Sequence, residues 1–113
     1  MVKTLEEQYK LVFDRLMKLM EKEKLEDTNI YYEGKRYSYD RNKEAIVIEE
    51  DMNVSDYIEY NNPNGVTISF EGELYHAINY GSNKPLFNKF ENVTKGTEVY
   101  YQLGYAWSAS FYN

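Results

Sequence analysis

The apolar residues of this chain change their spacing near residue 28, and this change constrains the fold more than any other feature. In the first 25 residues, apolar side chains recur at the spacing of an amphipathic helix. These side chains are Leu5, Tyr9, Val12, Phe13, Leu16, Leu19 and Met20. Thr4 and Glu7 have the spacing of a capping box, which predicts that the helix begins beside them. From Thr28 onwards short β segments with turn residues between them replace the helical pattern.

The first β segments are predicted to form a hairpin and a following strand. Residues 29–39 indicate a hairpin with a tight turn at Glu33–Gly34, and residues 44–48 indicate the next strand. Either Asn53 or Ser55 is suited to cap a short helix after that strand.

A second hairpin and a second short helix are expected in the following part of the chain. Residues 66–70 and 73–80 are interpreted as two strands joined by a turn at Glu71–Gly72. A helix is expected to begin near Pro85 and to end at Gly96.

The C-terminal segment, residues 97–112, has the most regular alternation. Large residues occupy every second position over the 14 residues from Val99 to Tyr112, whereas strands usually have about 3–10. The segment is either one long strand bent at Gly104 or a hairpin turning at Leu103–Gly104. We expect the bent strand, because the large residues stay in phase across the glycine.

Together these elements predict one α+β domain spanning residues 1–113. We expect an N-terminal helix packed on a curved, mostly antiparallel sheet of about six strands. With 13 tyrosines in the chain, many half-buried rings are expected to supplement an aliphatic core.

Composition excludes several classes of protein. The chain has no cysteine, so disulfides, thiolate catalysis and cysteine zinc sites are impossible. Its apolar runs are far shorter than the roughly 20 residues of a membrane span, and its N-terminus has no secretory pattern. We therefore expect a cytoplasmic protein without membrane contact. A net charge of −6 opposes direct binding of nucleic acid.

The negative charge is concentrated in the middle of the chain. Residues 44–83 carry −8 and contain no lysine or arginine, whereas the segments before and after this block each carry +1. The eight acidic residues are Glu44, Glu49, Glu50, Asp51, Asp56, Glu59, Glu71 and Glu73. Such a block is a solvated face, a divalent-cation site or a surface that binds a basic partner.

The cation site is the weakest of these three interpretations. Asp51, Asn53 and Ser55 occupy alternating positions, like the first ligands of a calcium loop. However, the sixth position is Asp56 instead of glycine, and the twelfth is Asn62 instead of glutamate. We therefore predict neither a metal nor any other cofactor.

The partner surface is the functional interpretation that we favour. Carboxylates in a compact array imitate the phosphates of duplex DNA and steer association towards a basic groove, and tyrosines are frequent in interface hot spots. The predicted partner-binding residues are Glu49, Glu50, Asp51, Asp56, Tyr57, Glu59 and Tyr60. We expect a non-enzymatic, DNA-mimicking inhibitor of a host nucleic-acid enzyme, of the anti-CRISPR or anti-restriction kind that phages and other mobile elements encode. An immunity protein for a basic nuclease toxin would bind its target through the same attraction between carboxylates and a basic groove.

Two other interpretations remain open. An aromatic pocket between helix and sheet, lined by tyrosines, Trp107 and Phe111, would bind a small molecule. A homodimer could form through an edge strand in the C-terminal segment.

Signals for catalysis or for binding single-stranded nucleic acid are weak. His76 is expected to be a partly buried structural residue, and Ser108 and Ser110 to be surface serines without a neighbouring base. No nucleophile and base occur together, so we expect no enzyme. The basic cluster at 35–43 alternates with tyrosines, as in single-strand binders, but the acidic block opposes that function.

Overall fold

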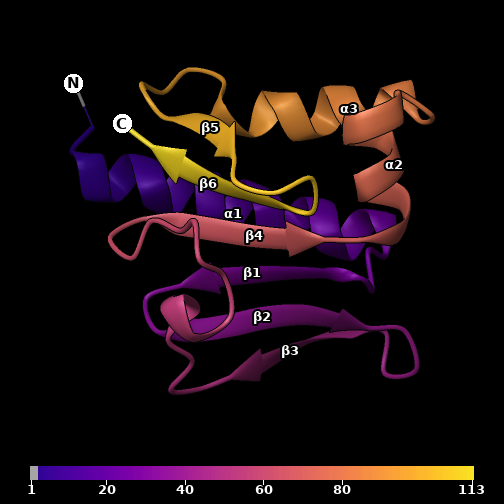
Figure 1. Cartoon of the computed structure of the whole chain (residues 1–113), viewed down its shortest axis with the longest axis horizontal. Coiled ribbons are helices and arrows are strands. Elements are labelled where there is room, and N and C mark those ends of the chain that lie inside the picture. The colour runs from indigo at the N-terminus through magenta and orange to yellow at the C-terminus, as the bar shows by residue number, and fades with distance from the viewer. Residues whose placement is uncertain (1–2) are drawn as a thin grey trace.

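The computed structural model describes residues 3–113. Its centre is one six-stranded antiparallel sheet with the order β3-β2-β1-β4-β6-β5 (Figure 1). The strands are β1 (Thr28–Tyr32), β2 (Lys35–Asp40), β3 (Ala45–Glu49), β4 (Val66–Phe70), β5 (Tyr100–Leu103) and β6 (Ser108–Tyr112). The helices are α1 (Leu5–Glu23), α2 (Gly72–Tyr80) and α3 (Lys84–Glu91), with 3-10 turns η1 (Val54–Asp56) and η2 (Asn92–Thr94). The predicted α+β class and antiparallel sheet are confirmed.

The N-terminal helix begins with the capping box that the sequence predicts. The Glu7 N–H donates to the Thr4 hydroxyl at 3.2 Å, and the Thr4 N–H donates to the Glu7 carboxylate at 3.0 Å. These bonds from Thr4, with the backbone bond first, lower the pKa of Glu7. The helix ends at Glu23, and the left-handed conformation of the capping residue Lys24 lets its N–H reach the carbonyls of the last turn.

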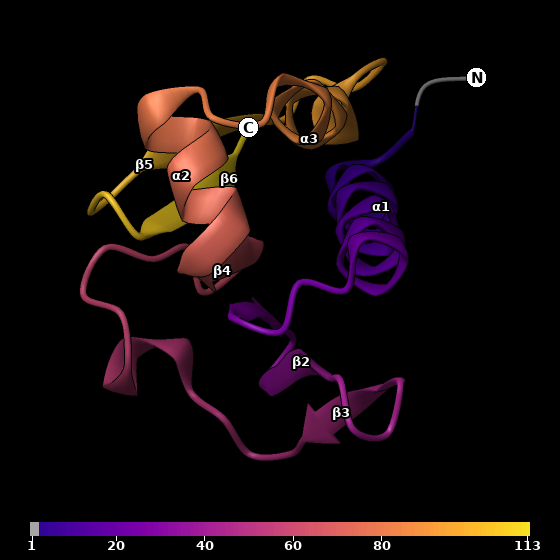
Figure 2. The ribbon, with the colours of Figure 1, turned by 90° about the vertical axis from the view of Figure 1, so that its right-hand side faces the viewer.

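The two sides of the sheet, here called the inner and outer faces, differ in what covers them. Helices α1 and α3 lie on the inner face, as the side view shows (Figure 2). Ile30, Ile68 and Phe111 point into this side and are at most 1% exposed. Phe13 of α1 stacks on Tyr32 with ring centroids 4.4 Å apart. The inner face is therefore an aliphatic core supplemented by aromatic rings.

The first hairpin and the two short helical segments confirm their predictions. Glu33 and Gly34 form the β1–β2 turn, both with positive φ, which a two-residue turn matching the twist of the strands requires. The Asn53 side chain caps η1, and Asn83 caps α3. However, α3 ends at Glu91 and a 3-10 turn follows it, so the expected end at Gly96 is too late.

One predicted strand is a helix. Residues Gly72–Tyr80, expected from Glu73 onwards to pair with 66–70, form α2 instead. Leu74 and Ala77 are buried at a three-residue spacing, and Gly81 ends the helix in a left-handed conformation. Consequently His76 lies on an exposed part of a helix and is not the partly buried strand residue that we expected.

The C-terminal segment is the hairpin β5–β6, so the expectation of one bent strand is wrong. The chain turns at residues 104–107, and Leu103 pairs with Ala109. A side chain at Gly104 would bring its Cβ within 2.7 Å of the Cβ of Tyr60, so this close approach requires glycine. The count of six strands is unchanged, because this extra strand replaces the one lost to α2.

Candidate partner-binding surface

Residues 50–65, here called the acidic loop, connect β3 to β4 and cross the outer face of the sheet (Figure 1). Val54 and Ile58 fix one part of the loop by packing on Tyr31, and all three are at most 9% exposed. This small cluster is separate from the inner core. The acidic loop is therefore a packed part of the fold.

Hydrogen bonds from Asn62 fix the other part of the acidic loop. Its amide Nδ2 donates to the carbonyl of Phe111 at 2.7 Å and to the hydroxyl of Tyr9 at 3.3 Å. Its backbone N–H donates to the Thr67 hydroxyl at 3.0 Å. Asn61 likewise donates to the carbonyl of Ile58 at 2.8 Å. These two asparagines thus position the loop.

Two serines that were expected on the surface lie buried beneath the loop. Ser108 and Ser110 are at most 1% exposed. The Ser110 hydroxyl lies 3.0 Å from that of Thr67 and donates to the carbonyl of Tyr60 at 3.3 Å. The Ser108 hydroxyl accepts the N–H of Tyr105 at 3.1 Å. The small polar residues of the outer face are therefore hydrogen-bonding supports for the loop and the neighbouring turn.

Two predicted partner-binding carboxylates are paired within the chain. Glu49 accepts from the guanidinium of Arg36 at 2.7 Å, and the Glu50 carboxylate lies 3.7 Å from the Lys35 ammonium. The basic cluster at 35–43 therefore lies beside the acidic block, a neighbourhood created by the β2–β3 register. Because these two carboxylates are paired with cations, the net charge of this surface is smaller than the −8 counted over residues 44–83.

Arg36 also joins the carboxylate Glu49 to an exposed aromatic side chain. Its guanidinium lies 5.3 Å from the centre of the Tyr57 ring, a cation–π distance, and the Tyr57 ring lies 6.0 Å from that of Tyr31. Hydrogen bonds with Tyr31 and Glu49 raise the pKa of Arg36. Tyr57 remains 51% exposed, so this group presents an aromatic edge to solvent.

A second exposed aromatic group forms where the loop meets the β5–β6 turn. The Tyr105 hydroxyl donates to Glu59 at 2.6 Å, and this bond raises the pKa of Tyr105. The Tyr105 ring lies 5.1 Å from that of Tyr60 and stacks on Trp107 at 5.0 Å. Sequence reasoning missed Tyr105 as a member of this surface, although its place beside Gly104 could have indicated a turn.

The remaining acidic residues do not form one array. Asp51 and Asp56 are exposed and, among residues 3–113, form no ion pair. Glu71 follows the end of β4 opposite to the end where the acidic loop enters that strand. The structure therefore places Glu49, Glu50 and Asp51 at one end of the sheet and Glu44, Glu71 and Glu73 at the other, while Glu59 reaches across the outer face to the β5–β6 turn.

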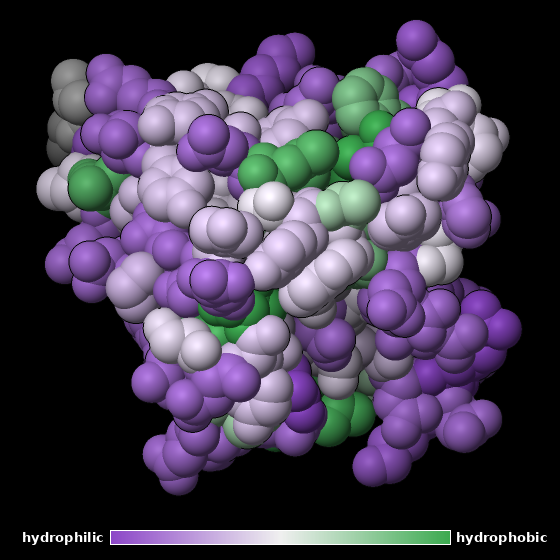
Figure 3. Space-filling view, in the orientation of Figure 1, coloured by the Kyte–Doolittle hydropathy of each residue, from purple (hydrophilic) through white to green (hydrophobic). Residues whose placement is uncertain are grey.

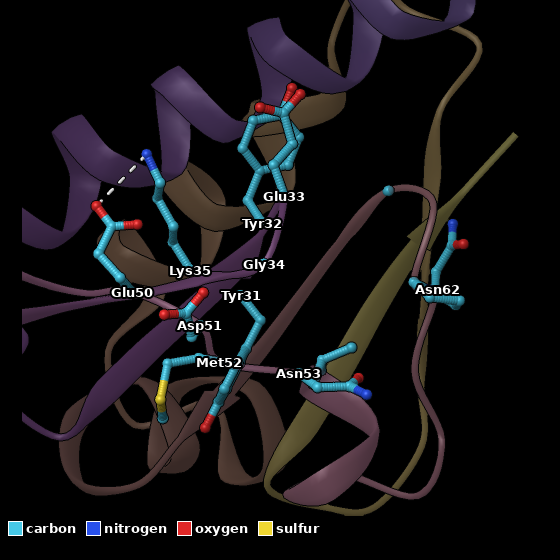
Figure 4. Close-up of a pocket in the computed structure, with 13 residues that line it drawn as sticks. Tyr31, Tyr32, Glu33, Gly34, Lys35, Glu50, Asp51, Met52, Asn53 and Asn62 are labelled. Carbon is cyan, nitrogen blue, oxygen red and sulfur yellow. Dashed lines mark ion pairs between the residues drawn. The ribbon is translucent and has the colours of Figure 1, made fainter.

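A hollow of about 500 Å³ lies at the same end of the sheet as Glu50 and Asp51. The β1–β2 turn, the start of the acidic loop and Asn62 border it (Figure 4). The ion pair between Lys35 and Glu50 lies at its rim. The outer face around it is largely polar, with apolar side chains in small separate areas (Figure 3).

The residues of the incomplete calcium pattern have a structural role. Asn53 accepts the N–H of Ser55 at 3.0 Å and thereby caps η1. Within the part of the chain that the structure describes, no three His, Asp or Glu residues form a group that could hold a metal.

The residues named for a small-molecule pocket do not come together. Phe111 is fully buried on the inner face, whereas Trp107 is 37% exposed in the β5–β6 turn. Phe111 packs with Phe90 and Tyr101 instead.

Comparison with family models, with curated proteins and with solved structures finds no match to this chain. Between residues 3 and 113, no helix has the combination of length and apolar character that crossing a membrane requires.

Proposed function

We propose that this protein is a non-enzymatic inhibitor that binds the basic nucleic-acid-binding site of a partner enzyme. The binding surface is the acidic loop with the end of β3, and its predicted residues are Glu49, Glu50, Asp51, Asp56, Tyr57, Glu59 and Tyr60. In this proposal the unpaired carboxylates of Asp51 and Asp56 take the place of phosphates. Tyr57 and Tyr60, each more than half exposed, supply the aromatic contacts.

One observation carries this proposal: the exposed acidic and aromatic side chains lie on a loop that the sheet holds in place. Val54 and Ile58 are buried beneath it, and Asn62 bonds it to β6. A fixed loop loses little conformational entropy on binding, so its contacts contribute more fully to affinity. A solvated face that served only solubility would not need such anchoring.

The distribution of charge limits the size of the proposed mimic. Arg36 and Lys35 pair with Glu49 and Glu50, so the negative charge that no cation neutralises lies mainly at Asp51 and Asp56. We therefore propose a small acidic and aromatic epitope rather than a long imitation of a DNA backbone.

Inhibition assays with a matched pair of triple variants test this function. The site variant is D51N/D56N/E59Q, and the control E44Q/E71Q/E73Q removes the same charge at the other end of the sheet. Purified restriction nucleases, CRISPR nucleases and basic nuclease toxins form the panel, the toxins representing the immunity-protein case.

We expect at least one enzyme to be inhibited by the wild-type protein, with duplex DNA competing. The site variant should weaken this inhibition by about tenfold or more, and the control should keep it. Equal inhibition by both variants, or no inhibition anywhere in the panel, would contradict the proposal.

A further inference from the structure

The border of the sheet at β3 is open. In Figure 1 no helix or strand lies beyond β3. The three central residues of β3 are Ile46, Val47 and Ile48, all apolar and β-branched. Neither a proline nor a lysine, which commonly protect edge strands, occurs along β3.

The register of the sheet shows which backbone groups face this open border. In a two-residue hairpin the flanking residues, here Tyr32 and Lys35, form a hydrogen-bonded pair, and such pairs alternate along antiparallel strands. Continuing the alternation through β2, the odd-numbered residues of β3 bond to β2. The N–H and C=O groups of Ile46 and Ile48 therefore point outwards, ready to pair with an added strand.

The side chains at this border also favour the addition of a strand next to β3. Ile48 is 53% exposed on the inner face, beside Tyr37 of β2. A strand added next to β3 would cover Ile48 with its own side chain on that face, because directly opposed residues share a face. Burial of apolar surface would then add to the backbone hydrogen bonds.

Charge decides which strand fits. Glu44 precedes β3 and Glu50, which pairs with Lys35 but remains 65% exposed, follows it, so the apolar edge has a carboxylate near each end. If two copies paired around Val47, Glu44 of one copy would oppose Glu50 of the other, and opposed like charges are destabilising. A foreign strand with lysine or arginine at both ends would instead meet opposite charges.

We propose that the β3 edge accepts an extended apolar segment, flanked by lysine or arginine, as a seventh strand from the partner. This inference rests on the proposed function, since the acidic loop that begins at Glu50 continues directly from this edge. The partner would therefore contribute a basic strand to β3 as well as a basic groove to the acidic loop.

Titration of the isotope-labelled protein with synthetic peptides, followed by NMR, tests the edge without any knowledge of the partner. The probe is Lys-Lys-Val-Thr-Val-Thr-Val-Lys-Lys, and the control peptide replaces each lysine with glutamate. We expect the basic peptide to shift the amide signals of Ile46 and Ile48, and the acidic peptide to leave them unchanged.

Two substitutions at Ile48 show whether the contact is made by the backbone edge. I48P removes an outward N–H that has no partner within the sheet, and I48K adds a charge at an exposed site that tolerates it. Each should weaken peptide binding by about tenfold, whereas L103K on the β5 edge should not.

Three results would overturn the inference: no shift at β3, equal binding of both peptides, or a wild-type dimer in sedimentation that I48K dissociates. The last result would show that the β3 edge pairs with a second copy of this protein. Peptide binding together with equal inhibition by the two triple variants would instead contradict only the proposed function of the acidic loop.

Discussion

The two faces of the sheet are held to the elements that cover them by different balances of apolar burial and hydrogen bonding, since the only buried apolar cluster that residues 3–113 form on the outer face is the small one of Tyr31, Val54 and Ile58. On the inner face, Ile68 and Phe111 are completely buried under helices, and their apolar surface gives the stability. On the outer face, Thr67 and Ser110 are equally buried, but they meet the acidic loop through hydroxyl groups. A hydrogen bond contributes only about 1 kcal/mol net, so the outer face positions its loop more than it stabilises the fold.

The largest expected effect comes from the inner face. Ile68→Ala removes a fully buried side chain from the central strand β4 and should lower the free energy of unfolding by about 2–5 kcal/mol. Urea denaturation measures this loss. Ile48→Ala, the control at a half-exposed site, should change it by no more than about 0.5 kcal/mol. Similar losses for both variants would contradict the claim that apolar surface buried under the helices gives the stability.

Removing the loop anchor should have a smaller and more local effect. Asn62→Ala deletes three side-chain hydrogen bonds, which are donated to Phe111 and Tyr9 and accepted from the Asn64 N–H, and should cost about 1–2 kcal/mol. Amide hydrogen exchange should accelerate in residues 53–61 and stay slow in β1 and β4. The control Asn64→Ala, an exposed residue in the same loop, should leave exchange unchanged. Equal acceleration throughout the sheet would show that the loop is not a separate unit.

The ion pair at the end of β3 should contribute less to the free energy of unfolding than the hydrogen bonds of Asn62 do. Glu49→Gln weakens the ion pair with Arg36, in which the Glu49 side chain is 42% exposed and the Arg36 side chain 24%. Since the pair is partly exposed, this substitution should lower the free energy of unfolding by about 0.2–1 kcal/mol at low salt. Added salt should reduce this difference. The control Glu44→Gln lacks an ion partner within the described residues, and a cost as large as that of Glu49→Gln would contradict the pairing.

The smallest effect concerns the titration of Tyr105. Its hydrogen bond to Glu59 raises the pKa of this hydroxyl, so the protonated form is favoured in the folded protein. The resulting stabilisation is complete at neutral pH and is lost as the pH rises through the raised pKa. Glu59→Gln should lower the pKa of Tyr105, as followed by NMR, while Glu73→Gln should not. An unchanged titration would remove this link between loop and turn.

Sequence reasoning succeeded where the determining interactions are local. The capping box of Thr4 and Glu7, and the two-residue turn at Glu33–Gly34, each involve neighbours within three residues. Such signals need no knowledge of the rest of the chain. They fixed the beginning of α1 and the first hairpin.

The two errors in the fold also have physical causes. In residues 73–80, tyrosine and isoleucine suggested a strand, whereas the buried pair Leu74 and Ala77 and the cap at Gly81 are helical. In the C-terminal segment, Leu103 pairs with Ala109, so odd-numbered residues share one face on both strands of the hairpin. Alternation is then identical for a hairpin and a single strand, and only the turn at Gly104 distinguishes them.

The candidate surface could be predicted only in its composition. The acidic residues and tyrosines of 49–60 are evident in the sequence, but their neighbours depend on register and on long-range contacts. The pairing of Glu49 with Arg36 comes from the β2–β3 ladder, and the contact of Glu59 with Tyr105 spans 46 residues. The choice of the partner-binding residues itself stays a prediction.

The central claim is that the acidic loop is a rigid part of the outer face, and backbone relaxation by NMR tests it most directly. For residues 53–62 we predict backbone order parameters of about 0.85, the value typical of rigid strands. Values below about 0.6 in the loop, with β1 and β4 still rigid, would contradict the claim, because the carboxylates and tyrosines would then have no fixed arrangement.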